Sequence, residues 1–309
     1  MRLLVLTILA LPIICSNVDA VPQDDLLEEL LRLRGKTGLS IASVGNFTME
    51  VTSVGRPHTV EKRPFPFEFM IGRIAPSGLE AIGLLMDGSL VKTDIAGRVS
   101  AVARKYSHLR SLALSRDGSM VALCGAFDVA GSAHGHLPRS GDRKYGIALI
   151  DLRTDSASAL LTFAAPSDLA GCGDITWAPS AEYVVYGYKD KLYRYSLRSR
   201  ESRFLREGSL PAWHPDGHWI AFRGRDSRIY LTDQSGRNSR VLVECNAVGG
   251  LRWSPDGRFL AFGETSRSGA AGSRLSVTRL IDGVTTSIRT SIHPEIGRDE
   301  GWAFVKPSQ

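Results

Sequence analysis

Histidine side chains at close spacing are the first candidates for chemistry in this 309-residue chain. His134 and His136 form the only close pair among seven histidines. On a β-strand, a His-x-His pair places both rings on one face, where they could hold a metal ion. Here the pair lies in a segment rich in Gly, Ser and charged residues, which is typical of a solvated loop. We therefore expect no metal and no other cofactor.

Arginines form the second group of candidates. Their planar guanidinium groups bind carboxylates and phosphates in a bidentate manner, so a cluster could form a polyanion site. The alternative is a solvated rim, because the formal net charge is only +6 and the pI is about 9.2. No aromatic residues are interleaved with these arginines, which argues against nucleic acid as a partner. The candidate binding residues are His134, His136, Arg139, Arg143, Arg223 and Arg225.

No sequence motif identifies a catalytic residue. A hydrolase domain would need the Gly-x-Ser-x-Gly turn that exposes a nucleophilic serine, and no such pentapeptide occurs. Gly-rich phosphate loops and calcium loops are also absent from the sequence. We therefore assign no catalytic residue and favour a function without catalysis, while enzymatic activity stays open.

The first twenty residues have the features of a secretory signal peptide. Met1-Arg2 supplies a positive start, residues 3–15 are largely apolar, and Val18-Asp19-Ala20 suits cleavage after Ala20. An uncleaved anchor and a lipoprotein modified at Cys15 are the alternatives. We expect an exported protein, periplasmic or extracellular, with no transmembrane segment in the mature chain.

Residues 21–37 are predicted to form a short helix and a linker. Leucines on one face of residues 24–35 would cover the main domain, or alternatively contact a partner or a membrane surface. Signal cleavage leaves Cys124, Cys172 and Cys245, so at most one disulfide can form within the chain. The simpler interpretation is that all three are small buried hydrophobic residues.

An internal repeat predicts the architecture. Trp213-His-Pro-Asp-Gly217 and Trp253-Ser-Pro-Asp-Gly257 are nearly identical, and an Ile/Leu-Ala-Phe strand follows each of them. With weaker copies, the fourth motif position recurs at residues 77, 117, 180, 216 and 256, so the period is close to 40. One longer interval accommodates an inserted loop at about residues 128–146. The structural residues of the repeat are Trp177, Trp213, Pro215, Asp216, Gly217, Trp253, Pro255, Asp256 and Gly257.

Each repeat contains a turn and strands with period-2 alternation. In one copy the strands are expected at residues 219–223, 228–232 and 239–243. Four strands in each unit of about 40 residues describe a β-propeller. A degraded sixth copy at residues 305–309 would join N-terminal strands to close the last blade. The predicted fold is an all-β, six-bladed β-propeller of four-stranded antiparallel blades over residues 38–309, with a short N-terminal helix.

The Trp-Ser-Pro-Asp-Gly-x-x-Leu-Ala-Phe pattern resembles the TolB-like, or WD40-like (PD40), β-propeller repeat family. TolB itself carries a sizeable α/β domain before its propeller, for which this chain has no room. The resemblance implies the fold, whereas the lack of a catalytic set favours a monomeric scaffold that binds a protein or peptide on one mouth. The alternative is a metal-dependent lyase or hydrolase acting on acidic carbohydrate, because oligogalacturonate lyases share this repeat and use propeller histidines to hold a metal.

Overall fold

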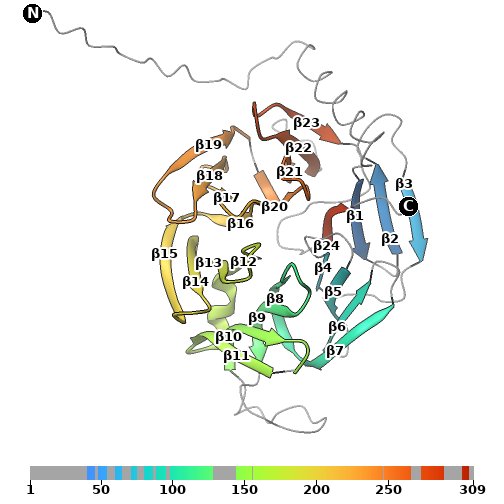
Figure 1. Cartoon of the computed structure of the whole chain (residues 1–309), viewed down its shortest axis with the longest axis vertical. Coiled ribbons are helices and arrows are strands. Elements are labelled where there is room, and N and C mark those ends of the chain that lie inside the picture. Colours follow the sequence, from blue (N-terminus) through green and yellow to red (C-terminus); the bar gives the residue numbers. More distant parts are fainter. Residues whose placement is uncertain are drawn as a thin grey trace, which may run out of the picture.

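The computed structural model describes residues 40–45, 48–53, 60–64, 71–74, 80–85, 88–94, 98–127, 144–154, 156–245, 247–265, 273–288 and 301–305. These residues form six four-stranded antiparallel sheets, arranged radially about a central axis (Figure 1). No helix of these residues is long and apolar enough to cross a membrane.

Five sheets are blades, each made of four consecutive strands with the first strand innermost. The first blade has β4 (Ile71–Ile74), β5 (Glu80–Leu84), β6 (Ser89–Asp94) and β7 (Val99–Lys105). The second has β8 (Ser107–Leu114), β9 (Met120–Phe127), β10 (Lys144–Asp151) and β11 (Ser156–Phe163). The third has β12 (Cys172–Trp177), β13 (Tyr183–Tyr188), β14 (Lys191–Ser196) and β15 (Glu201–Glu207). The fourth has β16 (Ser209–Trp213), β17 (Trp219–Arg223), β18 (Ile229–Asp233) and β19 (Ser239–Val243). The fifth has β20 (Ala247–Trp253), β21 (Phe259–Thr265), β22 (Ser273–Arg279) and β23 (Thr285–Ile288).

The remaining sheet is built from distant parts of the chain. It joins β24 (Gly301–Val305) to β1 (Ser40–Gly45), β2 (Thr48–Ser53) and β3 (Val60–Pro64). β24 pairs antiparallel with β1, so that Ser40 lies opposite Val305. β24 also neighbours β4 and β20, which places it beside the inner strands of the first and fifth blades.

The predicted fold class is corrected in its number of blades. The sequence predicted six blades, whereas the structure has five blades of consecutive strands and one sheet assembled from β24 and β1–β3. The sequence also predicted a short N-terminal helix, but residues 24–35 lie outside the described residues. Within the described part of the chain, the only helix is the 3-10 helix η1 (Pro166–Gly171), between β11 and β12.

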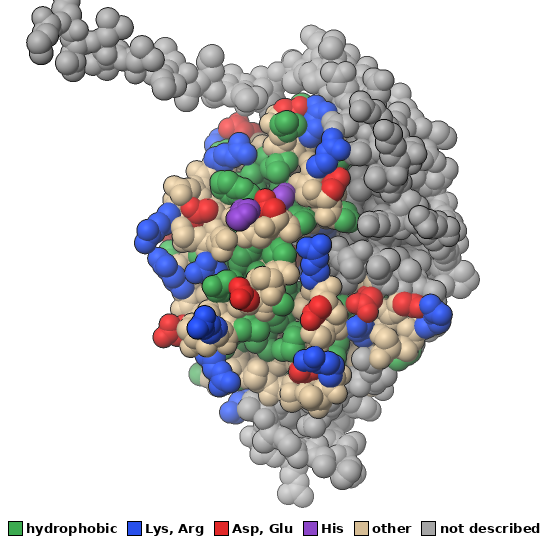
Figure 2. Space-filling model, viewed as in Figure 1, with side chains coloured by type: hydrophobic (Ala, Val, Ile, Leu, Met, Phe, Trp, Pro, Cys, Tyr) green, Lys and Arg blue, Asp and Glu red, His purple; other side chains and the backbone are tan. Residues whose placement is uncertain are grey.

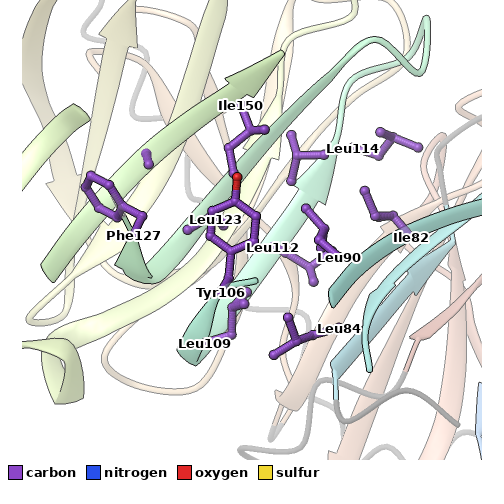
Figure 3. Packing of buried hydrophobic residues seen from close by; sticks show 12 residues of the cluster. Ile82, Leu84, Leu90, Tyr106, Leu109, Leu112, Leu114, Leu123, Phe127 and Ile150 are labelled. Atoms are coloured by element: carbon purple, nitrogen blue, oxygen red, sulfur yellow. The ribbon is translucent and has the colours of Figure 1, made fainter. Parts of the chain in front are cut away.

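The core consists of apolar layers between neighbouring blades. Successive side chains of a strand point to opposite faces, so a continuous buried run such as Val121–Phe127 of β9 supplies apolar residues to both faces of its blade. These faces contact the blades on either side. Figure 3 shows one such layer, in which Ile82, Leu84 and Leu90 of the first blade meet Leu112 and Leu123 of the second. Similar layers join the second blade to the third, the third to the fourth and the fourth to the fifth.

One disulfide connects the second blade to the third. Cys124 in β9 is bonded to Cys172 at the start of β12, with the two Cα atoms 6.5 Å apart. Cys245 is a free, buried cysteine. The sequence allowed at most one disulfide, and the structure identifies its two partners, so the interpretation of three unbonded cysteines is wrong.

Candidate binding site at one mouth of the ring

Chain direction places the turn that carries Arg225 at the same mouth of the ring as the adjoining ends of β9 and β10. Strands alternate in direction within each blade, and the innermost strands surround the axis side by side. The end of every second strand therefore lies at one mouth. The β17–β18 turn, which carries Arg225, and the ends of β9 and β10 at Phe127 and Lys144 share this mouth, which we call the β9–β10 mouth.

The segment that joins β9 to β10 contains four of the six candidate binding residues. His134, His136, Arg139 and Arg143 all lie outside the described residues, so their geometry is not part of this site. β10 begins at Lys144, and the expected loop of about residues 128–146 therefore overlaps the start of a strand. Elsewhere in the described ranges, no three His, Cys, Asp or Glu side chains are placed to hold a metal ion.

Arg223 ends β17, and Arg225 lies within the tight β17–β18 turn. The turn closes through a bond from the Gly224 N–H to the Arg228 carbonyl, and Ser227 adopts a left-handed φ of 67°. Arg223 Nη2 donates to Ser227 Oγ at 3.0 Å. Its Nε is buried and has no hydrogen-bond partner in the described structure. A buried donor without an acceptor costs about 1–3 kcal/mol, but this atom is shielded from solvent and would not contact a partner directly.

Ion pairs surround the same turn. Arg225 Nη1 lies 3.1 Å from Glu207 Oε2, and both side chains are more than half exposed. Arg228 lies 3.6 Å from Asp226 and also 3.6 Å from Glu244. Exposed pairs of this kind contribute only about 0–1 kcal/mol each, so a partner's carboxylate could replace them at low cost. A hydrogen bond to Asp226, together with partial burial, raises the pKa of the Tyr230 hydroxyl.

Charged side chains on the inner strands form a second cluster, closer to the axis. Arg73 in β4 donates from Nη2 to Asp174 Oδ1 in β12 at 2.9 Å, and from Nε to the Leu112 carbonyl in β8 at 3.3 Å. Arg252 Nη1 in β20 lies 3.9 Å from Asp174 Oδ2. Arg73 and Asp174 are buried, and Arg252 is nearly so. The cluster therefore ties four inner strands together across the ring.

The sequence contained an unused signal for this central cluster. Arg73 and Arg252 each stand directly before the first residue of a repeat motif, at Ile74 and Trp253. Equivalent positions in the repeats of a propeller lie at the same height around the axis. The repeat pattern therefore predicts that Arg73 and Arg252 lie at the same height on two inner strands. Asp174 stands three residues before Trp177, in a different register, and had no comparable signal.

The repeat residues lie in tight turns at the opposite mouth. Gly217 and Gly257 have φ values of +80° and +74°, which favour glycine, and their N–H groups bond to the carbonyls of His214 and Ser254. Asp216 Oδ1 accepts the His218 N–H at 2.7 Å. Burial alone would raise the pKa of Asp216, but the bonds from His218 and His214 outweigh it and hold that pKa below its usual value.

The described face shows no large patch of one charge. Figure 2 shows Lys and Arg side chains interspersed with Asp and Glu, with hydrophobic side chains between them. The formal charge of +6 is therefore not concentrated on this face.

Comparison with known proteins places the fold. No protein-family model matches the chain, and no curated protein matches it in sequence. The crystal structure of TolB from Acinetobacter baumannii is similar, with a TM-score of 0.61 and 13% identity over 87% of this chain and 66% of that one. The ring therefore has a β-propeller fold similar to that of this TolB.

The likeness extends to the fold alone. The chain spans 66% of the length of that TolB, just under two thirds. A functionally unknown protein from Desulfotomaculum acetoxidans also aligns, with a TM-score of 0.49 and 11% identity over 85% of this chain and 83% of that one. That second similarity is too low to support an argument.

Proposed function

We propose that the chain is an exported, non-catalytic β-propeller that binds a protein or peptide partner at the β9–β10 mouth. The observation that carries this proposal is the arginine cluster of the β17–β18 turn. There, the ion pairs of Arg225 and Arg228 are exposed to solvent and can exchange for a partner's carboxylates. The proposed organisation is a signal peptide at residues 1–20, a helix and linker at 21–37 and PD40-type repeats over residues 38–309.

The Cys124–Cys172 disulfide supports export. Disulfides persist in oxidising compartments, such as the bacterial periplasm and the extracellular space, and are rare in the cytosol. The bond joins two blades that also share an apolar layer, so it reinforces a contact that the fold already makes. A protein with this bond is suited to the destination that the signal peptide predicts.

The chemistry of the mouth favours a partner that presents carboxylates. Arginine forks bind carboxylates in a bidentate manner, and Asp or Glu side chains and chain termini supply them in proteins and peptides. On binding, a carboxylate of the partner would replace Glu207 as the ion-pair partner of Arg225. The rigid sheets below the turn would hold the arginines in place, which lowers the entropic cost of recognition.

The test compares arginines at the two mouths. The variant Arg225→Glu/Arg228→Glu reverses two exposed charges at the β9–β10 mouth, and Arg153→Glu/Arg237→Glu does the same in third-to-fourth-strand turns at the opposite mouth. Purified proteins are crosslinked in periplasmic extract, and captured partners are quantified by mass spectrometry. We expect the first variant to lose at least about tenfold in recovery of a specific partner, equivalent to 1.4 kcal/mol.

The second variant should recover that partner as the wild type does. Equal recovery by all three proteins would contradict a site at this mouth. Deleting residues 128–143 in a third variant then tests whether the loop with His134 and His136 belongs to the same site. Circular dichroism of each variant verifies that the sheets are intact.

A further inference from the structure

The outer edges of the six sheets differ in how well they are protected against pairing. The outermost strand of each sheet has one hydrogen-bonding edge with no partner strand among the described residues. Such an edge can pair with another strand unless charge, proline or short length prevents it. β3 has three charged residues and Pro64, β7 ends in Arg104-Lys105, β19 carries Arg240, and β23 has only four residues. β15 has four charged residues among seven.

β11 has none of these protections. Its eight residues, Ser-Ala-Ser-Ala-Leu-Leu-Thr-Phe, include no charge and no proline. It pairs with β10 along its whole length, from Asp151 opposite Ser156 to Tyr145 opposite Phe163, with one bulge. The strand is therefore held firmly on its inner side, and it lies at the outer margin of the ring (Figure 1).

Side-chain size also favours close approach to β11. Its larger residues contact the apolar layer between the second and third blades, and its exposed side chains are small. The exposed residues are Ser156, Ser158, Ala159 and Thr162. Small side chains let a second strand reach the spacing of about 4.8 Å that a β-ladder requires.

We propose that β11 pairs with β11 of a second copy of this chain, in an antiparallel, two-fold symmetric dimer whose axis passes at Ala159, so that Ala159 of one copy lies opposite Ala159 of the other. A strand that pairs with its own copy across a two-fold axis places the same residues opposite one another in reverse order. In β11 no like charges meet in any register. In β15, by contrast, pairing centred on Phe204 would oppose Glu201 with Glu207. Like charges directly opposite are destabilising, so self-pairing favours β11 over β15.

The residues before β11 do not oppose this pairing. Arg153 lies just before the strand, and its guanidinium already pairs with Asp151 at 3.1 Å. Two-fold pairing brings this end of one copy beside the Phe163 end of the other, where no charge faces it. The dimer joins two blades into one continuous sheet, in place of the monomer that the sequence predicts.

The size of the contact sets the expected strength. A stable interface buries about 1,200–2,000 Å² in total, and one pair of eight-residue strands supplies only part of that. We therefore expect a weak dimer that forms reversibly as the protein concentration rises. The inference is independent of partner binding at the β9–β10 mouth, because β11 lies at the outer rim and the Arg225 turn at the mouth.

Sedimentation equilibrium of the full chain tests the dimer. We expect the average molar mass to rise from that of a monomer toward that of a dimer as the protein concentration is raised about a hundredfold. Ala159→Lys places a charge on the exposed edge and should weaken dimerisation at least about tenfold. Ser239→Lys adds the same charge to β19, another exposed edge, and should leave the dissociation constant unchanged.

A mixing experiment separates edge pairing from misfolding. Ala159→Lys and Ala159→Glu should each be monomeric alone, and an equimolar mixture should regain association at least as strong as in the wild type. A wild type that stays monomeric throughout overturns the proposal. So does a dimer that Ala159→Lys leaves intact, or one that Ser239→Lys weakens equally.

Discussion

Two junctions between blades contain an equivalent tryptophan hydrogen bond, but different additional contacts stabilise each junction. Between the second and third blades, Trp177 Nε1 donates to the Ala113 carbonyl at 2.9 Å. Between the fourth and fifth blades, Trp253 Nε1 donates to the Ala212 carbonyl at 3.0 Å. Both alanines directly precede the first motif residue of the earlier repeat. The repeat therefore provides the same joint twice.

The reinforcement at each junction comes from residues outside the consensus. The second and third blades are joined by the Cys124–Cys172 disulfide. The fourth and fifth are joined by His214, whose Nε2 lies 2.8 Å from the Gly257 carbonyl and whose ring meets Trp253 edge-on at 4.6 Å. Ser254, at the equivalent motif position, bonds within its own turn to Asp256 and Phe259. A single deviation from the repeat thus converts a self-contained turn into a bond between blades.

Removing the covalent reinforcement should have the largest effect. The bond joins cysteines 48 residues apart, and losing such a crosslink costs about 2–4 kcal/mol. We expect Cys124→Ala/Cys172→Ala to lower the free energy of unfolding by that amount in urea denaturation. Cys245→Ala, which leaves the disulfide intact, is the control. Equal stability of the double variant and the wild type would show that the apolar layer and the Trp177 hydrogen bond hold this junction without the disulfide.

Removing the polar reinforcement should rank second. His214→Ala loses the bond to Gly257, leaves a cavity beside Trp253 and should cost about 2–3 kcal/mol. His214→Ser restores the residue found in Ser254's repeat, so it keeps the turn and loses only the contact between blades. It should recover part of the loss in thermal or urea unfolding. Full recovery would show that the histidine serves its own turn and not the junction.

The shared tryptophan bond should give equal effects at both junctions. Trp177→Phe and Trp253→Phe each remove one hydrogen bond and should each cost about 1–2 kcal/mol in chemical denaturation. Trp213 donates instead to the Gly217 carbonyl of its own turn, so Trp213→Phe is the matched control within one blade. Clearly unequal losses for Trp177 and Trp253 would contradict the equivalence of the two joints.

A third junction should show a small dependence on pH. The β18–β19 turn meets the third blade through Arg194 and Arg206, which donate to the carbonyls of Gln234 and Gly236. Within that turn, hydrogen bonds from Ser235 and Asn238 lower the pKa of Asp233 to about 2. Because the folded-state pKa is below the unfolded value of about 3.9, the stabilisation is present above about pH 4.

That stabilisation should fall away as the pH drops from about 4 toward 2. Asp233 is partly exposed to solvent, so the effect should be no more than about 0.5–1 kcal/mol. Urea denaturation of the wild type and Asp233→Asn across this range measures it. The variant should be less stable than the wild type at pH 5, and the difference should shrink at pH 2. A difference in stability that stays constant from pH 5 to pH 2 would show that the introduced asparagine side chain itself is destabilising, independently of the charge on Asp233.

The fold was more predictable from sequence than the site. The expected strands at residues 219–223, 228–232 and 239–243 match β17, β18 and β19 to within one residue, because local alternation and turn chemistry determine them. The Cys124–Cys172 pairing depends on how neighbouring blades face each other, which no local pattern contains. The same holds for Asp174, whose two arginine neighbours come from other blades. All six candidate binding residues stay predictions, and four of them lie outside the described residues.

The pairing of β24 with β1 has a consequence for the order of folding. Ser40 and Val305 must meet across almost the whole chain, a contact of very long sequence separation. Closing such a loop costs entropy before any contact compensates it, so this step is expected to be slow relative to formation of the individual blades. A nascent chain cannot complete the ring until β24 has been synthesised. Until then β1 keeps an unpaired edge, which makes this interval the one most exposed to misassembly during folding.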